Sequence, residues 1–331
     1  GAGTEGGAGT EGGAGTEGDA GARPFAAWVS YPDPHTPYEV PRAWAETVPP
    51  ASVVLPPAQG DDEALPERNR VLRRILDVSG ESDDDLRRAV AVYHAQVRFV
   101  DDGVGRILDA LDRLALREDT IVVFCSDHGD LAGEHGMTRK GGLFYDCLVR
   151  VPLIVSWPGH VPEGAVEASP VNLLDIVPTL LTLQGLDVPR EMMGRPLSTV
   201  TDAAPRSATF SEYGAGGQAC TLSDVEALPE PHGLDAAKAT LHWREAEGRR
   251  KMVRTTEWKY VTDPLGDLDE LYDLRADPWE LTNRAADPAL AATIADLRRL
   301  LLEWALTTED HRPPPLPSPA PRLGTTTRSS S

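Results

Sequence analysis

The segment Ser126-Asp127-His128-Gly129 follows directly on an apolar run that begins at Thr120. We expect a buried strand over residues 120–126 that presents a carboxylate and an imidazole at its carboxyl end, where ligands bind in open α/β sheets. An oxygen donor and a neutral nitrogen donor on adjacent residues suit a divalent cation such as Ca²⁺, Mg²⁺ or Mn²⁺. Asp127 and His128 are therefore candidate metal ligands. The alternative is an ordinary strand end in which Asp127 caps the following turn.

Two basic residues could serve the same site. Lys140 is followed by Gly141 and Gly142, which favour a loop that bends close to a ligand. Its ammonium could contact an anionic substrate, although most lysines simply face solvent. His35 lies among prolines directly after another apolar run, and its imidazole could donate a hydrogen bond or a proton to a leaving group. The alternative for His35 is a rigid surface turn.

The chain has 331 residues, with 52 acidic and 32 basic side chains and a formal net charge of -20. This surplus of negative charge argues against nucleic acid or an anionic membrane as the main partner. A small anionic substrate can still bind to a local cluster of Lys, His and metal. No apolar stretch approaches the roughly 18 residues of a membrane-spanning helix, and the first residues lack the pattern of a signal peptide. We therefore expect no membrane partner and a cytoplasmic location.

Strands and helices alternate through the first part of the chain. Apolar runs predict three strands, over residues 25–31, 120–126 and 152–157. Apolar residues at steps of three and four predict a helix over residues 83–116, with Ser82 and Asp85 as its N-terminal capping signal. A second amphipathic helix is predicted over residues 172–184. Elements in this order indicate an α/β domain with a layered, mainly parallel sheet.

The pattern changes after residue 215. Two strands of a hairpin, a third strand and a helix are predicted over residues 251–255, 257–262, 269–274 and 288–306, which makes a small α+β subdomain. A Gly-Ala-Gly-Thr-Glu-Gly repeat opens the chain and a tail rich in Pro, Ser and Thr closes it, and both contain too few apolar residues to fold. We therefore expect a disordered start, an α/β domain, the α+β subdomain and a disordered tail, over residues 1–23, 24–215, 216–310 and 311–331.

Taken together, these motifs resemble the sulfatase family of the alkaline-phosphatase-like superfamily. The resemblance rests on Ser126-Asp-His-Gly-Asp130, Gly133-Glu-His-Gly136, Lys140 and Val149-Arg-Val-Pro-Leu-Ile-Val155. The turn around His35 and the stretch from Lys251 to Asn283 are similar to further parts of the family, so the resemblance covers nearly all of residues 24–306. It implies an alkaline-phosphatase-like α/β fold in which residues 24–215 are the C-terminal part of the catalytic domain.

The resemblance also implies a role for each candidate residue. Asp127 and His128 would bind the divalent metal, Lys140 would contact the sulfate or phosphate group, and His35 would contact that group or the leaving oxygen. The family hydrolyses sulfate esters with a formylglycine made from Cys or Ser in a Cys/Ser-x-Pro-x-Arg motif. Its hydrated aldehyde attacks sulfur while the metal and basic residues stabilise the developing charge. The implied partner is a small-molecule sulfate ester, as for an arylsulfatase.

The chain departs from the family in one respect. No Cys/Ser-x-Pro-x-Arg motif occurs in it, and the family's N-terminal strand with its pair of metal-binding Asp residues is also absent. We therefore expect the chain to be the C-terminal part of a sulfatase and to be inactive as it stands. Two alternatives remain open: a phosphonate monoester or phosphodiester hydrolase of the same superfamily, and a non-catalytic remnant or binding module. The sequence leaves the oligomeric state open.

Overall fold

The computed structural model describes residues 24–58, 62–78, 80–227 and 247–308. The chain divides into two compact units, residues 1–32 and 33–331, and each is described by itself. The segments expected to be disordered, 1–23 and 311–331, lie outside the described residues.

In the first unit, the described residues form no strand, so the strand expected over 25–31 is wrong. Phe25, Trp28 and Val29 are exposed, at 59%, 90% and 58%. An apolar run becomes a strand only where its backbone groups pair with a neighbouring strand. The run alone therefore does not specify one.

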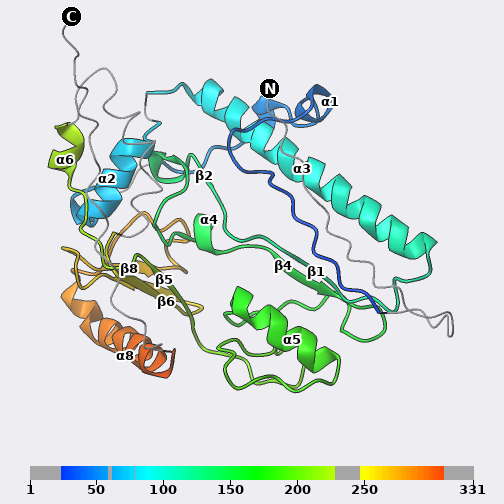
Figure 1. The fold of residues 1–331 in the computed structure, drawn as a ribbon. Helices are drawn as coiled ribbons and strands as arrows, with labels where there is room; N and C mark the ends of the chain where they lie inside the picture. Colours follow the sequence, from blue (N-terminus) through cyan, green and yellow to red (C-terminus); the bar gives the residue numbers. More distant parts are fainter. Residues whose placement is uncertain (1–23, 59–61, 79, 228–246, 309–331) are drawn as a thin grey trace, which may run out of the picture. The chain divides into compact units, whose positions relative to one another are not determined.

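The long helix predicted from the sequence is confirmed as α3, Asp83–Arg113 (Figure 1). Its N-terminal turn is capped as expected, because the Ser82 hydroxyl accepts a hydrogen bond from the Asp85 N–H at 3.2 Å. One face of α3 is buried, and part of that face packs against Val48 and Val53. The helix also contacts the short helices α1, Arg42–Ala45, and η1, Pro50–Ser52.

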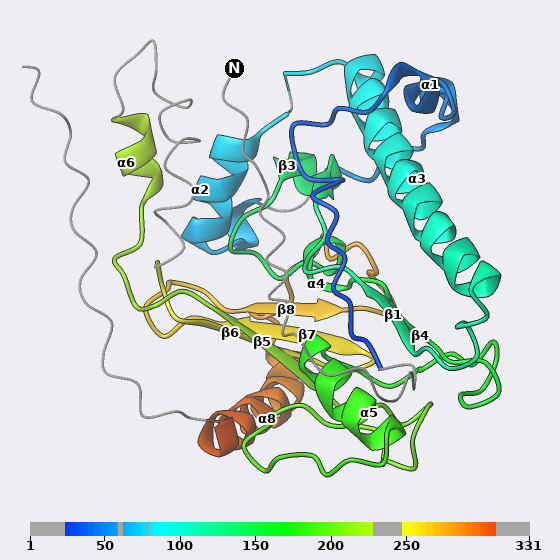
Figure 2. The same cartoon turned by 45° about the vertical axis from the view of Figure 1, so that its right-hand side comes forward.

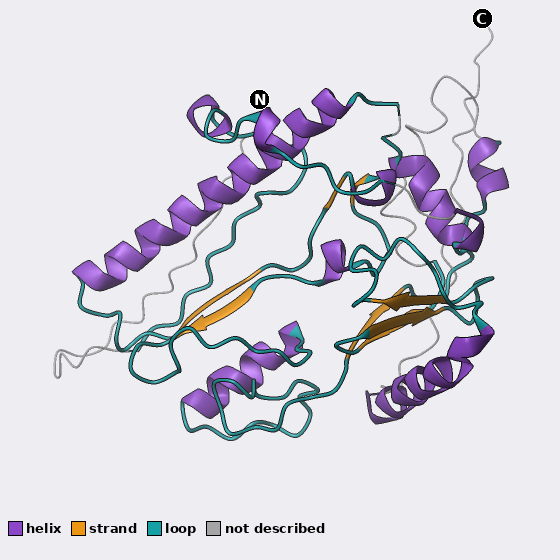
Figure 3. Ribbon diagram, turned by 180° about the vertical axis from the view of Figure 1, so that it is seen from behind, coloured by secondary structure: helices purple, strands orange, loops and turns teal. Residues whose placement is uncertain are grey.

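Two predicted strands form as β1, Val122–Cys125, and β4, Leu153–Ser156 (Figure 3). They pair antiparallel, with Val122 opposite Ser156, whereas the sequence led us to expect a mainly parallel sheet. The chain between them folds back as a hairpin of β2, Leu131–Ala132, and β3, Thr138–Arg139, and a single turn, α4, Asp146–Val149. It thus returns beside β1 in the opposite direction. Every residue of β1 is only half-buried.

The helix predicted over 172–184 is confirmed as η4, Leu173–Asp175, continued by α5, Ile176–Leu183. Asn172 caps its start in a reciprocal arrangement with Asp175. The following Gly185 has φ 70°, the left-handed conformation that ends many helices.

The C-terminal hairpin, third strand and helix are also confirmed. The strands are β6, Arg250–Arg254, β7, Trp258–Thr262, and β8, Glu270–Asp273, and the helix is η6, Pro288–Leu290, continued by α8, Ala291–Thr308. They belong to a four-stranded antiparallel sheet against which α8 packs (Figure 2). Its first strand, β5, Thr209–Tyr213, was not predicted and precedes the boundary expected at residues 215 and 216. The sheet therefore spans that boundary, and the division into domains stays a prediction.

A further helix, α2, Glu67–Leu76, supplies one side of the largest buried cluster. Its buried residues Val71, Leu72, Ile75 and Leu76 meet Leu131, Met137, Leu143, Tyr145 and Leu148. These partners flank the loop that carries Lys140. The remaining elements are short: η2, Asp62–Ala64, η3, Glu134–Gly136, and α6, Leu222–Glu226. None of the helices in the described ranges has both the length and the apolar character to cross a bilayer.

Candidate functional site

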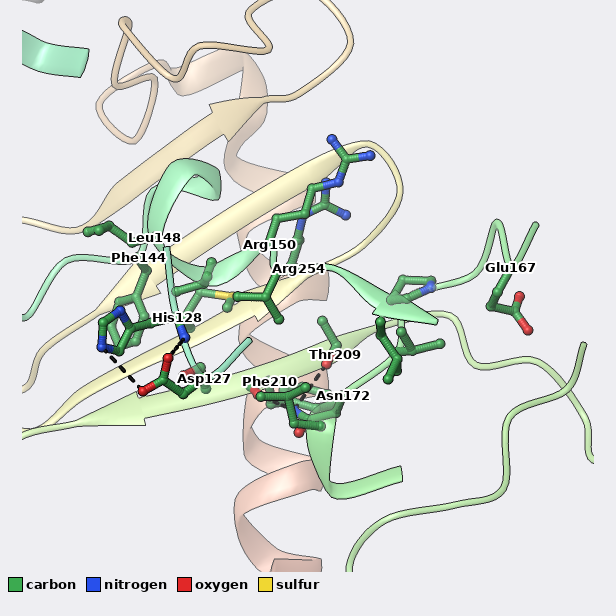
Figure 4. Close-up of a pocket in the computed structure, with 18 of the residues that line it drawn as sticks. Asp127, His128, Phe144, Leu148, Arg150, Glu167, Asn172, Thr209, Phe210 and Arg254 are labelled. Carbon is green, nitrogen blue, oxygen red and sulfur yellow. Dashed lines mark hydrogen bonds and ion pairs between the residues drawn. The ribbon is translucent and has the colours of Figure 1, made fainter. Parts of the chain in front are cut away.

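The predicted ligand pair lies on the loop that leaves β1. The Asp127 side chain is 84% exposed and that of His128 is 41% exposed. The His128 N–H donates to Asp127 Oδ1 at 2.9 Å, and Asp127 Oδ2 lies 3.5 Å from His128 Nε2 (Figure 4). The carboxylate and the imidazole thus face the same small region, and their role as ligands of one ion stays a prediction.

The ring nitrogens of His128 have different partners. Nδ1 lies 2.8 Å from the Gly129 carbonyl oxygen, which can only accept, so Nδ1 carries the proton. Nε2 lies 3.0 Å from Lys140 Nζ, which can only donate. The geometry therefore assigns the Nδ1–H tautomer, with the lone pair of Nε2 directed at Lys140. A histidine that binds metal through one nitrogen usually donates the other N–H to such a carbonyl.

The backbone behind His128 is held by α4. The Gly129 N–H donates to the Leu148 carbonyl at 2.7 Å. A Cβ at position 129 would lie 1.9 Å from the Cys147 carbonyl oxygen. Only glycine lets the loop approach α4 this closely, which gives a structural reason for the glycine in Ser-Asp-His-Gly.

Lys140 leaves the β2–β3 hairpin directly after Arg139. The turn of this hairpin bends sharply, with Gly133 and His135 at φ 109° and 55°, and Arg139, at the end of β3, has φ 70°. Leu131, opposite Arg139, is fully buried and anchors the hairpin in the core. The hairpin thereby brings the lysine back to the His128 ring, so the structure joins three of the four predicted site residues.

His35, the fourth, lies on an exposed turn whose position is set by neighbouring residues. Its Nδ1 lies 2.6 Å from the Thr36 carbonyl oxygen. The Tyr38 hydroxyl at the end of the turn donates to Asp130 Oδ2 at 2.7 Å. On α3, the Gln96 amide donates to Asp33 Oδ1 at 3.1 Å, and the Tyr93 ring meets the Tyr38 ring edge-on with centroids 5.5 Å apart.

Asp130 connects the His35 turn electrostatically to the loop that carries Asp127 and His128. Burial raises the pKa of its carboxyl, whereas the Tyr38 hydrogen bond and the charges of Lys140, His128 and His35 act in the opposite direction. Burial and the nearby Asp130 carboxylate also raise the pKa of Tyr38. Sequence reasoning missed both residues. Asp130 directly follows the Asp-His-Gly motif, but nothing in the sequence pairs it with Tyr38.

One cavity of about 1340 Å³ brings these groups together. Its lining includes His35, Asp127, His128, Asp130 and Lys140. It extends along β4 to Arg150, Glu167, Asn172, Phe210 and Arg254 (Figure 4). The four predicted site residues therefore open onto one space, with two cationic side chains, Arg150 and Arg254, farther along it.

The donor set suits a metal ion only in part. Asp127 and His128 offer one oxygen and one nitrogen, but the described ranges contain no cluster of three or more His, Cys, Asp or Glu side chains that could hold an ion. Lys140 also covers the lone pair of Nε2. A divalent ion needs further ligands, and it reaches His128 only when Lys140 moves aside.

The known proteins that this chain resembles in sequence are sulfatases. A family model described as Sulfatase matches residues 14–186. Choline-sulfatase of Rhizobium meliloti is 30% identical over 275 residues, which are 80% of this chain and 47% of that protein. Human arylsulfatase K is 33% identical over 203 residues, which are 61% of this chain and 34% of that protein. The chain thus spans half or less of the length of these two curated relatives.

Two phosphonate monoester hydrolases of known structure have a similar fold. A phosphonate monoester hydrolase from Silicibacter pomeroyi aligns with a TM-score of 0.68 and 27% identity, covering 84% of this chain and 55% of that one. A phosphonate monoester hydrolase of Agrobacterium radiobacter aligns with a TM-score of 0.64 and 28% identity, covering 83% of this chain and 55% of that one. These neighbours confirm the alkaline-phosphatase-like α/β fold class expected from the sequence.

Proposed function

The chain belongs to the sulfatase family, and from that premise we propose that the protein is a sulfuric ester hydrolase acting on a small-molecule sulfate ester. The observation that carries the proposal is the contact of 3.0 Å between Lys140 Nζ and His128 Nε2, beside Asp127 and on the same cavity as His35. A metal-ligand pair and an anion-binding lysine on adjoining loops suit an ester whose sulfate group carries negative charge.

In this proposal each residue acts on a defined part of the ester. Asp127 and His128 contribute an oxygen and Nε2 to the binding of a divalent ion, Ca²⁺, Mg²⁺ or Mn²⁺. That ion would supply positive charge beside the sulfate oxygens. Lys140 leaves His128 and donates to a sulfate oxygen, while His35 donates a hydrogen bond or proton to the leaving oxygen. Asp130 and Tyr38 hold the His35 turn against the loop.

The nucleophile is the part of the proposal for which this chain offers no residue. The family resemblance implies a formylglycine, and the 331 residues contain no Cys/Ser-x-Pro-x-Arg motif. We therefore propose that these residues supply metal ligands and anion contacts, and we expect no turnover of an aryl sulfate by the purified chain with added metal. Turnover that disappears in Asp127→Asn would contradict this expectation.

Hydrolysis of a phosphonate monoester or phosphodiester is the second candidate. It is favoured by the two phosphonate monoester hydrolases that align with TM-scores of 0.68 and 0.64. The substrates of both candidate reactions carry a tetrahedral anionic group, so the same lysine and histidine residues would bind either substrate. A third possibility, a binding module without catalysis, predicts anion binding without turnover. The cytoplasmic location likewise stays a prediction from the sequence.

The experiment is a calorimetric titration of the chain with inorganic sulfate and with methylphosphonate, each with and without Mn²⁺. A sulfatase site predicts tighter binding of sulfate, strengthened by Mn²⁺ and lost in Lys140→Met. Tighter binding of methylphosphonate would favour the second candidate. Asp127→Asn should lose the strengthening by Mn²⁺, and Asp102→Asn, which changes an exposed carboxylate on α3, is its matched control. Anion binding that is unchanged in Lys140→Met would refute the proposed site.

A further inference from the structure

The ammonium of Lys259, on β7, is fully buried. It donates to the Phe144 carbonyl at 2.7 Å and to Asp146 Oδ1 at 2.7 Å, and it forms an ion pair with Glu280 Oε1 at 2.5 Å. A buried lysine is costly unless such partners surround it. Its partners lie in the segment that follows Lys140 and in the loop after β8. Lys259 therefore joins the C-terminal sheet to the segment that follows Lys140.

Asp146 is the residue on which this junction converges. Arg254, on β6, donates to it from Nε at 3.0 Å and from Nη2 at 2.8 Å, one bond to each carboxylate oxygen. The backbone N–H of Asp146 donates to Glu280 Oε2 at 2.5 Å. Burial alone would raise the pKa of Asp146, but Arg254 and Lys259 outweigh burial and lower it to about 2. The first residue of α4 is thus fixed through both its side chain and its backbone.

Helix α4 has only four residues, Asp146–Val149, and so little helix cannot hold its own conformation. Its position therefore depends on the contacts at Asp146. The other end of α4 carries the Leu148 carbonyl, which accepts the Gly129 N–H at 2.7 Å. Gly129 in turn presents the carbonyl that holds the Nδ1–H of His128 at 2.8 Å. A continuous series of bonds runs from Lys259 to the imidazole.

We propose that Lys259, together with Asp146, is a positioning residue for the metal-ligand loop: it fixes α4, and α4 fixes the Gly129 peptide that selects the Nδ1–H tautomer of His128. The inference rests on the proposed function, in which the lone pair of Nε2 binds the metal ion once Lys140 has moved aside. In a free histidine side chain the proton prefers Nε2, so the Nδ1–H tautomer inferred for His128 needs a fixed carbonyl at Nδ1. Without α4 in place, Nε2 would carry the proton and offer no lone pair.

The test reads the tautomer directly by nitrogen NMR of the chain labelled at its eight histidines, with His128 assigned by the signal lost in His128→Gln. The wild-type chain should show His128 with Nδ1 protonated. In Asp146→Asn, which keeps the size of the side chain, His128 should shift to a largely Nε2–H form. The Gly129 amide should also exchange with solvent about tenfold faster or more.

The matched control is Arg206→Met. It breaks another ion pair, part-buried, between Arg206 Nη2 and Asp175 Oδ1 at 2.7 Å, which lies at the start of α5 and not on this path. Arg206→Met should lose stability and leave the His128 tautomer unchanged. A folded Asp146→Asn variant with an unchanged tautomer and unchanged Gly129 exchange would overturn the inference.

If Asp146→Asn does not fold, the double variant Lys259→Met/Glu280→Gln takes its place, because it removes both charges of that pair together. The wild-type chain gives an independent check, since an unprotected Gly129 amide or an Nε2–H tautomer of His128 also overturns the inference. Failure of the proposed function would appear differently, as absent anion and metal binding with the tautomer results intact.

Discussion

The Tyr38 hydroxyl donates to Asp130 Oδ2 at 2.7 Å, across 92 positions of sequence. This bond joins the turn that carries His35 to the loop that carries Asp127 and His128. Both residues are part-buried, so neither group can exchange its partner freely for water. A side-chain hydrogen bond therefore couples the two halves of the proposed site.

We predict that Tyr38→Phe lowers the free energy of unfolding by about 1–2 kcal/mol, because it removes this bond and leaves a part-buried carboxylate without its donor. Urea denaturation measures the change. Tyr93→Phe is the control, since it keeps the ring contact with Tyr38 and removes a hydroxyl for which no hydrogen bond is found within the described ranges. Equal stability of Tyr38→Phe and wild type would show that the bond contributes nothing.

Gly129→Ala should destabilise the chain by roughly 1–3 kcal/mol or more, because the new methyl group would lie 1.9 Å from the Cys147 carbonyl oxygen. Thermal unfolding reports the loss. Gly105→Ala provides the opposite case, since it lies within α3 with no atom within 4 Å of the added Cβ. That variant should gain about 0.5–1 kcal/mol from helix propensity. Tolerance of alanine at position 129 would contradict the described packing of the loop on α4.

Stability should fall between pH 6.5 and about 4 through His135. Its ring is buried and stacked on Tyr145 with centroids 3.7 Å apart, and burial, with Arg73 nearby, lowers its pKa to about 4. In the unfolded chain its pKa is about 6.5. Acid therefore protonates the unfolded state first, and stability present above pH 6.5 is lost as the pH falls toward 4, by up to about 3 kcal/mol.

The measurement is the difference in unfolding free energy between wild type and His135→Asn across this pH range. Asparagine is chosen because it tolerates the left-handed conformation of residue 135, at φ 55°. The difference should shrink as the pH falls. His94→Asn, on the exposed side of α3, should leave the wild-type slope unchanged. A pH-independent difference for His135→Asn would contradict the prediction.

Lys140→Met should change metal and anion binding in opposite directions. The ammonium covers Nε2 of His128 at 3.0 Å and repels a cation there, so its removal should strengthen Mn²⁺ binding by about tenfold. Sulfate binding should weaken, because the anion loses its donor. Calorimetry measures both. Lys251→Met, which removes a lysine paired with Glu212 at 2.7 Å, should alter neither. Parallel changes in both affinities would argue against the role proposed for Lys140.

The sequence predicted elements whose own pattern was strong. The spacing of apolar residues along α3 and α5 and the apolar and aromatic residues of β6 and β7 stand out without any partner. Strand β5 was missed because its residues, Thr209-Phe-Ser-Glu-Tyr213, contain no apolar run. Helix α2 was missed because it follows a stretch rich in proline and acidic residues. The direction of β4 against β1 was missed because direction depends on how the connecting chain folds, which periodicity does not record.

The site residues likewise divide into those that a local sequence motif predicts and those that it does not. Asp127, His128, Lys140 and His35 could be chosen from motifs, since each sits in a recognisable local pattern, although their chemical roles stay predictions. The groups that hold them in place were not foreseen. Asp130 accepts a hydrogen bond from Tyr38, and Asp146 accepts one from Lys259, which lies 113 positions away in the sequence. Pairings over such distances arise only from the packed fold.

Paramagnetic broadening of the eight histidine ring signals by substoichiometric Mn²⁺ tests whether Asp127 and His128 are ligands of a divalent ion. We predict that the His128 signal broadens first, that Asp127→Asn abolishes the effect, and that Asp102→Asn does not. If Mn²⁺ leaves His128 sharp, or broadens another histidine first, the pair is not a metal site and the proposed function loses its support.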